Sequence, residues 1–262
     1  MRITLSEHHA EAAVLGGSVL GGGGGGKIEG GLKWATLAVN WGSPVLVSLD
    51  EFEDEEVIVV ASAVGAPAAV ESFVRPADHI KALELLLETR PCGLAGIIAN
   101  ENGASSGVNG WLQAAAMNLP IVDAPCNGRA HPTGLMGAMG VNRLAGYTSI
   151  QAAVGGNPAQ GRYLEMVAGG RLETIANMVR YASVQAGGTV AVARDPLPAA
   201  YLRKHAAPGA TSQAIRLGEA MMAARKDGAQ AIIKAVTSEL EGRIAAQGRI
   251  TKVELKTVGG YD

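Results

Sequence analysis

Four side chains of types that often take part in catalysis lie close together in residues 121–134, IVDAPCNGRAHPTG. They are the carboxylate of Asp123, the thiol of Cys126, the guanidinium of Arg129 and the imidazole of His131. A carboxylate and an imidazole can exchange protons with a substrate, and a guanidinium can hold a carbonyl or carboxylate oxygen. A solvated surface turn, or an Asp123–Arg129 ion pair that fixes the loop, would explain the same residues. Nothing nearby marks Cys126 as an activated nucleophile, so we expect a structural thiol there.

Two other loops follow apolar strand patterns and carry polar or glycine residues. One comes after residues 94–99 (LAGIIA), and the other comes after residues 57–64 (VIVVASAV). The candidate residues in these loops are Glu101, Asn109, Gly65, Pro67 and Glu71. Glu101 is a second candidate general base, whereas Glu71 is more typical of a carboxylate at a helix end.

Residues 21–26 are six consecutive glycines between two apolar helical patterns. The backbone N–H groups of such a run can bind an anion or a substrate carbonyl, and Gly23 and Gly24 lie at its centre. A purely structural turn explains the run equally well. The run lacks the Lys–Ser/Thr ending of a P-loop and no strand precedes it, so we expect no nucleotide cofactor.

The order of elements predicts how these loops are positioned. Strand patterns that alternate with helical patterns indicate parallel strands joined by right-handed crossovers. Parallel strands would bring the loops after residues 57–64, 94–99 and 119–123 to one edge of the sheet, where α/β proteins bind ligands. Further along the chain we expect a strand at 147–154, a helix at 161–182, a strand at 189–193, an irregular connection at 195–208, two helices beginning near 211 and 231, and a strand at 249–258.

Composition excludes several classes of protein. The chain has 262 residues, 48% of them hydrophobic, and a net charge of −2, so it is long enough and apolar enough to fold around a core. It has no Lys/Arg-rich tract for nucleic acid, no apolar stretch long enough for a membrane span and no signal-peptide pattern. Its two cysteines, Cys92 and Cys126, do not make a disulfide framework. We therefore expect a cytoplasmic protein that binds neither nucleic acid nor membrane.

Several motifs, taken in order, resemble the S-methyl-thiohydantoin desulfurase domain family. The most specific is LPIVDAPCNGRAHP at 119–132. It is accompanied by the glycine run LGGGGGGKIEGGL, VGAPAAVE at 64–71, SGVNG at 106–110, GATSQAIRLGEAMMAARKDG, and GRITKVELKTVGGY near the end. The chain departs from the family pattern at Pro125, where an Asp is usual, and at His131, where an aromatic residue is usual. Glu101 fills the place of a family Glu only if its loop carries extra residues. Because of these departures, the resemblance does not identify the substrate.

The resemblance implies a three-layer α/β/α sandwich around a mixed, largely parallel sheet. It also implies that residues 1–262 form a single α/β domain like the N-terminal domain of the family, with the second β domain of longer members absent. Family members often occur beside hydantoinase/oxoprolinase-type proteins, so such a partner, and a homo-oligomer, are expected.

We therefore expect a hydrolase-like enzyme acting on a small cyclic amide, imide or thiohydantoin-type substrate. The expected catalytic residues are Asp123, Arg129, His131 and Glu101, and the expected substrate-binding residues are Gly23, Gly24, Gly65, Pro67, Glu71 and Asn109. A divalent metal stays open as a cofactor. The alternatives are an accessory subunit of a hydantoinase/oxoprolinase-type complex, and a lyase or hydratase acting on a related small substrate.

Overall fold

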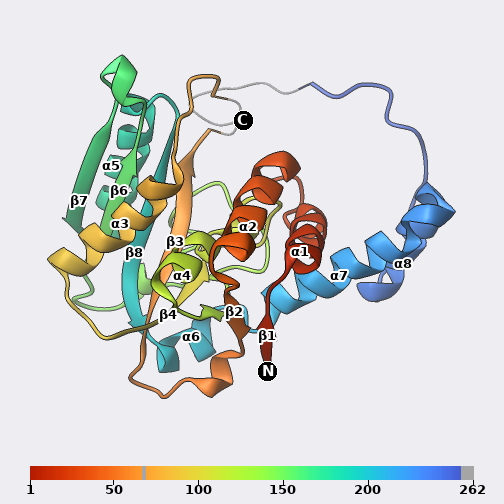
Figure 1. Cartoon of the computed structure of the whole chain (residues 1–262), viewed down its shortest axis with the longest axis horizontal. Helices are drawn as coiled ribbons and strands as arrows, with labels where there is room; N and C mark the ends of the chain where they lie inside the picture. The colour runs from red at the N-terminus through yellow and green to blue at the C-terminus, as the bar shows by residue number, and fades with distance from the viewer. Residues whose placement is uncertain (67–68, 255–262) are drawn as a thin grey trace.

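The computed structural model describes residues 1–66 and 69–254, and its framework is an eight-stranded sheet (Figure 1). The strand order across the sheet is β1-β2-β5-β4-β3-β8-β6-β7. The strands are β1 (Arg2–Thr4), β2 (Val45–Val47), β3 (Val57–Gly65), β4 (Leu94–Ala99), β5 (Ile121–Val122), β6 (Ser149–Gly155), β7 (Leu164–Gly170) and β8 (Thr189–Pro198). The neighbours β2, β5, β4 and β3 are parallel, and the remaining pairings are antiparallel. The sheet is therefore mixed, as predicted.

Helices cover both faces of this sheet. They are α1 (Glu7–Leu20), α2 (Ile28–Gly42), α3 (Pro76–Thr89), α4 (Trp111–Met117), α5 (Leu172–Gln185), α6 (Ala199–His205), α7 (Ala210–Ala224) and α8 (Ala229–Glu239). One apolar cluster joins the sheet to buried residues of α1, α2, α3, α4 and α7. Two others join its opposite face to α5 and α6. This arrangement confirms the α/β sandwich.

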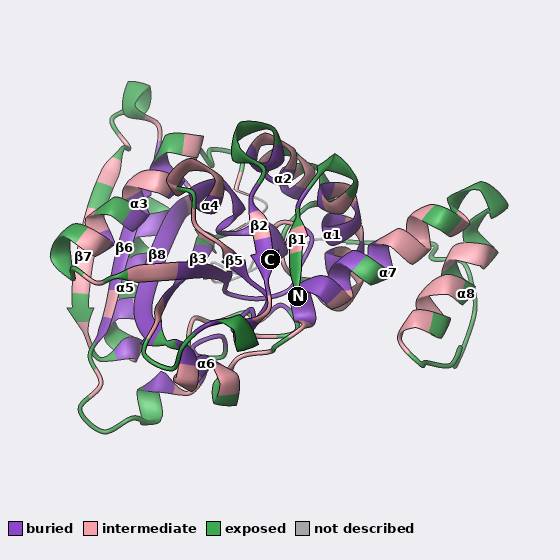
Figure 2. Cartoon of the chain, turned by 60° about the horizontal axis from the view of Figure 1, so that its bottom comes forward, coloured by how far each residue is buried: buried purple, intermediate pink, exposed green. Residues whose placement is uncertain are grey.

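The strand sequences explain why the sheet lies at the centre of the molecule. Residues 58–62 of β3 are all buried, and so are residues 96–99 of β4. Strands with apolar or small residues on both faces are typical of a sheet covered by helices on both sides. Figure 2 shows this purple interior, and it also shows α8 at one end of the molecule with no buried residue. Within the described ranges, no helix has the length and apolar character that a membrane crossing requires.

Three expectations about elements were wrong in part. Residues 161–182 do not form one helix, because β7 pairs with β6 first and α5 begins only at Leu172. Gly170 (φ +159°) separates the two elements. The connection at 195–208 is not irregular, since β8 continues to Pro198 and α6 follows. Residues 249–254 are exposed and form no strand, and the rest of the expected strand at 249–258 lies outside the described residues.

Candidate functional site

Three segments that are distant in the sequence come together at the carboxyl ends of β4 and β5. The carbonyl of Gly25 accepts hydrogen bonds from the backbone N–H groups of Ser105 (2.8 Å) and Ser106 (2.9 Å). The N–H of Asn102 donates to the carbonyl of Asn127 (3.0 Å). The glycine run, the loop after β4 and the loop after β5 therefore form one structural unit.

The glycine run follows α1 and precedes α2, and its conformation explains its composition. Gly22, Gly23, Gly25 and Gly26 all have positive φ, a region that residues with a side chain rarely adopt. A Cβ at Gly25 would stand 2.5 Å from the Cα of Gly103, and a Cβ at Gly24 would stand 2.9 Å from the Cβ of Ala130. The run thus packs against both other loops, while Gly22, Gly23 and Gly24 remain exposed.

Glu101 and His131 form a buried pair at the centre of this unit. Glu101 is 6% exposed, and the side chain of His131 is 5% exposed. The Glu101 Oε2 atom accepts a hydrogen bond from the backbone N–H of His131 (3.0 Å) and lies 3.1 Å from its Nε2 atom. Neither ring nitrogen of His131 makes a well-formed hydrogen bond within the described residues, although the backbone of Asn100 and of Thr133 lies close enough to raise the pKa of the ring. Buried ring nitrogens left in this state are unusual and suggest a role beyond packing.

The charge state of His131 follows from its surroundings. Burial lowers the pKa of His131 most strongly, the Glu101 carboxylate raises this pKa, and the Arg194 guanidinium lowers it. The net direction is below the ordinary pKa of histidine, so the imidazole is neutral at neutral pH and can accept a proton. The backbone at Gly137 lies against the ring, since a Cβ there would stand 1.8 Å from Nε2. This contact fixes the ring position and requires glycine.

Asp123, an expected catalytic residue, accepts hydrogen bonds from the start of α7. It is 3% exposed, and its Oδ1 atom accepts hydrogen bonds from the backbone N–H groups of Thr211 (2.9 Å) and Ser212 (3.1 Å). Its carbonyl also accepts from the N–H of Gly209 (2.8 Å). These donors belong to the first turn of α7 and the residue before it, where a carboxylate is stabilised by unpaired N–H groups and by the helix dipole. Asp123 therefore fastens α7 to the loop after β5.

Arg129 and Asn109 lie at the borders of the same unit. Arg129 is exposed, and a Cβ at Gly22 would stand 3.9 Å from its Nη2 atom, which places the guanidinium beside the glycine run. The expected alternative, an Asp123–Arg129 ion pair, is not formed among the described residues, because the Asp123 carboxylate points to α7. Asn109 is buried and donates from Nδ2 to Oδ1 of Asn100 (3.0 Å), which braces the loop after β4.

The loop after β3 does not join this unit. Ala61 of β3 is level with Ala99 at the end of β4, so β3 extends four residues further and places Gly65 beyond the site. A Cβ at Gly65 would stand 1.9 Å from the carbonyl oxygen of Gly188, and Glu71 forms an ion pair with Arg162 (2.8 Å). Pro67 lies outside the described residues. The register of β3 against β4, which the sequence pattern did not reveal, separates these candidates from Glu101 and His131.

Arg194 is the buried charge that the sequence analysis missed. It is 4% exposed and lies within β8, between Val60 of β3 and Gln151 of β6. A Cβ at Gly134 would stand 3.5 Å from its Nη1 atom, so the guanidinium lies under the loop that carries His131. The available signal is a charged residue in an apolar strand sequence, TVAVARDP at 189–196, whereas the predicted strand ends at residue 193.

Two further groups complete the polar surroundings. Asp195 has a positive φ of 48°, and its Oδ1 atom accepts from the hydroxyl of Tyr147 (3.0 Å) and the N–H of Ile150 (3.2 Å). Burial raises the pKa of the Asp195 carboxyl. Burial also raises the pKa of the Cys126 thiol to about 12, so this thiol stays protonated and is a poor nucleophile.

Comparison with models of known protein families identifies the family of this chain. Models of the S-Me-THD-like N-terminal domain and the S-Me-THD-like C-terminal domain match residues 8–160 and 171–262. The chain belongs to the S-Me-THD-like family. The C-terminal match begins at the start of α5, within the chain, so β8 falls in that part although it pairs with β3 and β6.

Among solved structures, a crystal structure is similar to this S-Me-THD-like chain over most of its length. It is the crystal structure of a protein from Chromobacterium violaceum, 25% identical in sequence, with a TM-score of 0.71. The match covers 92% of this chain and 67% of the other. No curated protein matches the chain.

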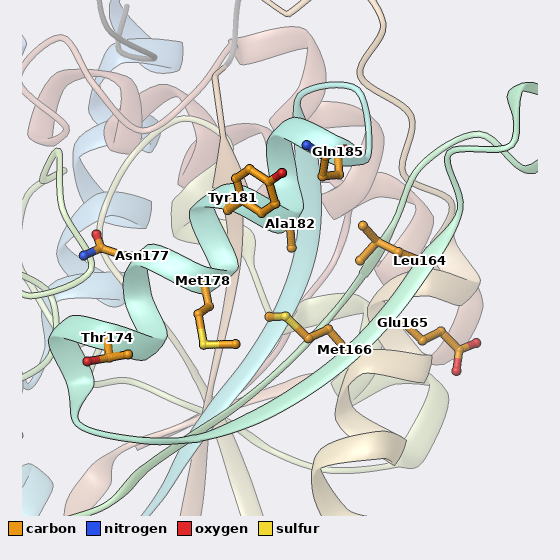
Figure 3. Close-up of a pocket in the computed structure, with 9 residues that line it drawn as sticks. All are labelled: Leu164, Glu165, Met166, Thr174, Asn177, Met178, Tyr181, Ala182 and Gln185. Carbon is orange, nitrogen blue, oxygen red and sulfur yellow. The ribbon is translucent and has the colours of Figure 1, made fainter.

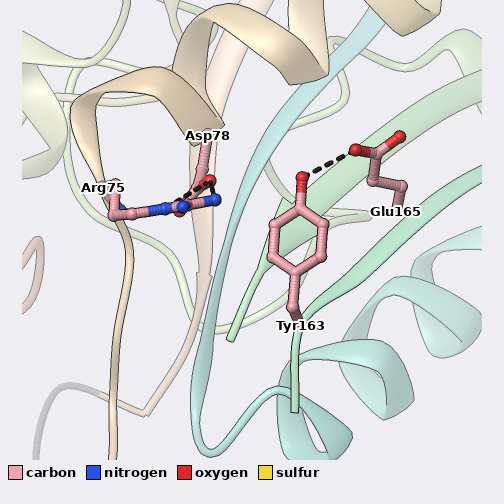
Figure 4. Close-up of polar contacts among 4 residues, drawn as sticks. All are labelled: Arg75, Asp78, Tyr163 and Glu165. Atoms are coloured by element: carbon pink, nitrogen blue, oxygen red, sulfur yellow. Dashed lines mark hydrogen bonds and ion pairs between the residues drawn. The ribbon is translucent and has the colours of Figure 1, made fainter. Parts of the chain in front are cut away.

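The S-Me-THD-like chain also has two open hollows on either side of β7, away from the Glu101–His131 pair. One lies between β7 and α5, has a volume of about 620 Å³ and is mostly apolar, with Met166, Met178 and Tyr181 among its lining residues (Figure 3). The other lies against α3, where Arg75 pairs with Asp78 (2.7 Å) and the Tyr163 hydroxyl donates to Glu165 (2.6 Å; Figure 4). Within residues 1–66 and 69–254, no three His, Cys, Asp or Glu side chains are grouped closely enough to hold a metal ion.

Proposed function

We propose that this chain is a hydrolase-like enzyme that acts on a small cyclic amide, imide or thiohydantoin-type ring. The observation that carries the proposal is the buried Glu101–His131 pair beneath the loops after β4 and β5. A neutral imidazole beside a carboxylate is a common arrangement for moving a proton to and from a reacting water. Membership in the S-Me-THD-like family supports the type of substrate.

The geometry supports a simple sequence of steps. His131, held neutral by burial, takes a proton from water as its oxygen attacks the ring carbon. The Glu101 carboxylate stabilises the imidazolium that results, since it lies 3.1 Å from Nε2. The C–N or C–S bond of the tetrahedral adduct then breaks, and the proton passes from His131 to the leaving amine or thiol. Exposed Arg129 and the exposed backbone of Gly23 and Gly24 would face the substrate from the rim.

Glu101→Gln tests this proposal directly. The change keeps the size of the side chain but removes the charge that stabilises the imidazolium, so we expect kcat to fall by about two orders of magnitude or more. Turnover of hydantoins and S-methyl-thiohydantoins would be measured with chelator and with added divalent cations, so that the same assay detects a metal requirement.

Glu71→Gln is the matched control, because Glu71 pairs with Arg162 outside the site. It should retain wild-type turnover. If Glu101→Gln is as active as the wild-type protein, the proposed site is wrong.

A second candidate function is supported by the apolar hollow between α5 and β7. Met178 and Tyr181 are exposed there, and such a surface is typical of contacts between proteins (Figure 3). On this proposal the chain is an accessory subunit that works with a hydantoinase/oxoprolinase-type partner or with a second copy. Turnover that appears only after such a partner is added, and that is lost with Tyr181→Glu, would favour this candidate.

A further inference from the structure

The position of Arg194 in the sheet is unfavourable for an unpaired charge. β8 lies between β3 and β6, and residues 190–197 of this strand are buried. Removing a guanidinium from water is costly unless charged or polar groups replace the lost hydration. A cation held here therefore requires a compensating group.

The described part of the chain does not offer Arg194 that group. Its guanidinium has five N–H donors, yet no hydrogen bond or ion pair joins it to any residue within 1–66 and 69–254. The neighbouring carboxylates are engaged elsewhere: Asp195 accepts from Tyr147 and Ile150, and Glu101 accepts from His131. They balance the charge at a distance but leave the donors of the guanidinium unused.

Two observations describe the immediate surroundings of the Arg194 guanidinium. Gly134 has no side chain to cover the guanidinium, and a Cβ there would stand 3.5 Å from Nη1. Ser62 of β3 is two residues from Val60, the register partner of Arg194, and so shares its face of the sheet. The Ser62 Oγ atom is buried and has no hydrogen-bond partner within the described residues. An unused hydroxyl and an unused guanidinium thus lie on one face of the sheet.

We propose that Arg194 binds a carboxylate of the ligand, so that the substrate is a small cyclic amide, imide or thiohydantoin that carries a carboxylate. A planar guanidinium can bind a carboxylate through two parallel hydrogen bonds, which fixes orientation as well as position. Arg194 and His131 lie under the same loop, so a substrate anchored at Arg194 would present its ring to the Glu101–His131 pair. This inference rests on the proposed function for the identity of the ring, but not for the anion site itself.

Binding measurements on the full chain test the inference without relying on turnover. The probes are carboxymethylhydantoin and its uncharged counterpart, carbamoylmethylhydantoin, titrated calorimetrically into the wild-type, Arg194→Gln and Glu101→Gln proteins. We expect the wild-type protein to bind the carboxylate probe at least about tenfold more tightly than the carboxamide. Arg194→Gln should lose this preference, and Glu101→Gln should keep it.

Equal binding of the two probes by the wild-type protein, or no binding of the carboxylate probe, would overturn the inference. So would a preference that survives in Arg194→Gln. If Glu101→Gln remains fully active but the carboxylate preference still depends on Arg194, the catalytic proposal fails and the anion site stands.

The melting temperature of Arg194→Met supplies a measurement independent of any ligand. Met has a similar volume and no charge, so replacing an unpaired buried cation should leave the melting temperature of the ligand-free protein unchanged or raise it. A clear fall would identify Arg194 as a structural cation and would contradict the proposal.

Discussion

His79 of α3 packs edge-on against Trp34 of α2, with 5.2 Å between the ring centroids, and it is only 7% exposed. Burial lowers the pKa of His79 to about 4, although the charge of Asp78 opposes this. Between pH 6.5 and about 4 the unfolded chain therefore binds more protons at this residue than the folded protein does. Its contribution to stability is complete above pH 6.5 and is lost as the pH falls toward 4.

We expect the titration of His79 to lower the free energy of unfolding by roughly 3 kcal/mol when the pH falls from 7 to 4. Urea unfolding at both pH values would measure the loss in the wild-type protein and in His79→Gln, where it should be smaller by about that amount. His8→Gln is the control, because the side chain of His8 is exposed. Identical pH dependence in the wild-type protein and His79→Gln would show that His79 is not buried in its neutral form.

The site shows which residue roles a sequence can predict. The pattern of polar residues after apolar strands located Glu101 and His131, and the structure brings these two together. The same pattern could not predict the partner of Asp123, because the first turn of α7 lies 88 residues further along the chain. Arg194 was missed for another reason: a charged residue normally ends a buried strand, whereas β8 continues past it. A buried charge within a strand interrupts the run of apolar residues by which buried strands are predicted.

At the scale of elements, α1 and α7 pack so closely that glycine is required at their contact. A Cβ at Gly218 of α7 would stand 1.8 Å from the carbonyl oxygen of Ala12, and a Cβ at Gly16 of α1 would stand 1.8 Å from the carbonyl oxygen of Ala214. Replacing an exposed glycine in a helix with alanine usually raises the stability of the protein, because alanine has the higher helix propensity. Here the steric overlap reverses the sign of the effect.

We expect Gly218→Ala to lower the free energy of unfolding by about 1–3 kcal/mol, because the helices must separate to admit the methyl group. Gly30→Ala in α2 is the matched control, since its Cβ would meet only ordinary contacts at 3.6 Å. It should raise stability by about 0.5–1 kcal/mol. Chemical denaturation would measure the change in the free energy of unfolding of each variant relative to the wild-type protein. A Gly218→Ala protein as stable as the wild type would contradict the close packing of α1 and α7.

The errors at this scale have a common physical origin. Residues 164–170 contain apolar residues at spacings that suit either a helix or a strand, and only pairing with β6 decides between them. Residues 249–254 alternate in polarity as a strand would, yet no neighbouring strand pairs with them. Periodicity records which residues prefer burial, but it does not record whether a partner element is present.

At the scale of the whole molecule, the two matched family regions share one sheet. β8 lies in the C-terminal match, whereas its neighbours β3 and β6 lie in the N-terminal match. The helix α7 also comes from the C-terminal match, packs on α1 and is capped by Asp123. The core is therefore completed only when both regions are present.

A chain cut to residues 1–160 should not fold by itself. Without β8, the edges of β3 and β6 lose their hydrogen-bonding partner, and apolar side chains such as Ile58 and Val60 lose their cover. Unpaired strand edges beside exposed apolar surface favour aggregation. Circular dichroism and gel filtration would measure the outcome, and a monomeric fragment with native-like secondary structure would contradict the shared core. A chain that lacks residues 241–254 provides the control, because these residues are exposed and form neither helix nor strand, so their removal should leave the sheet, the helices and cooperative unfolding intact.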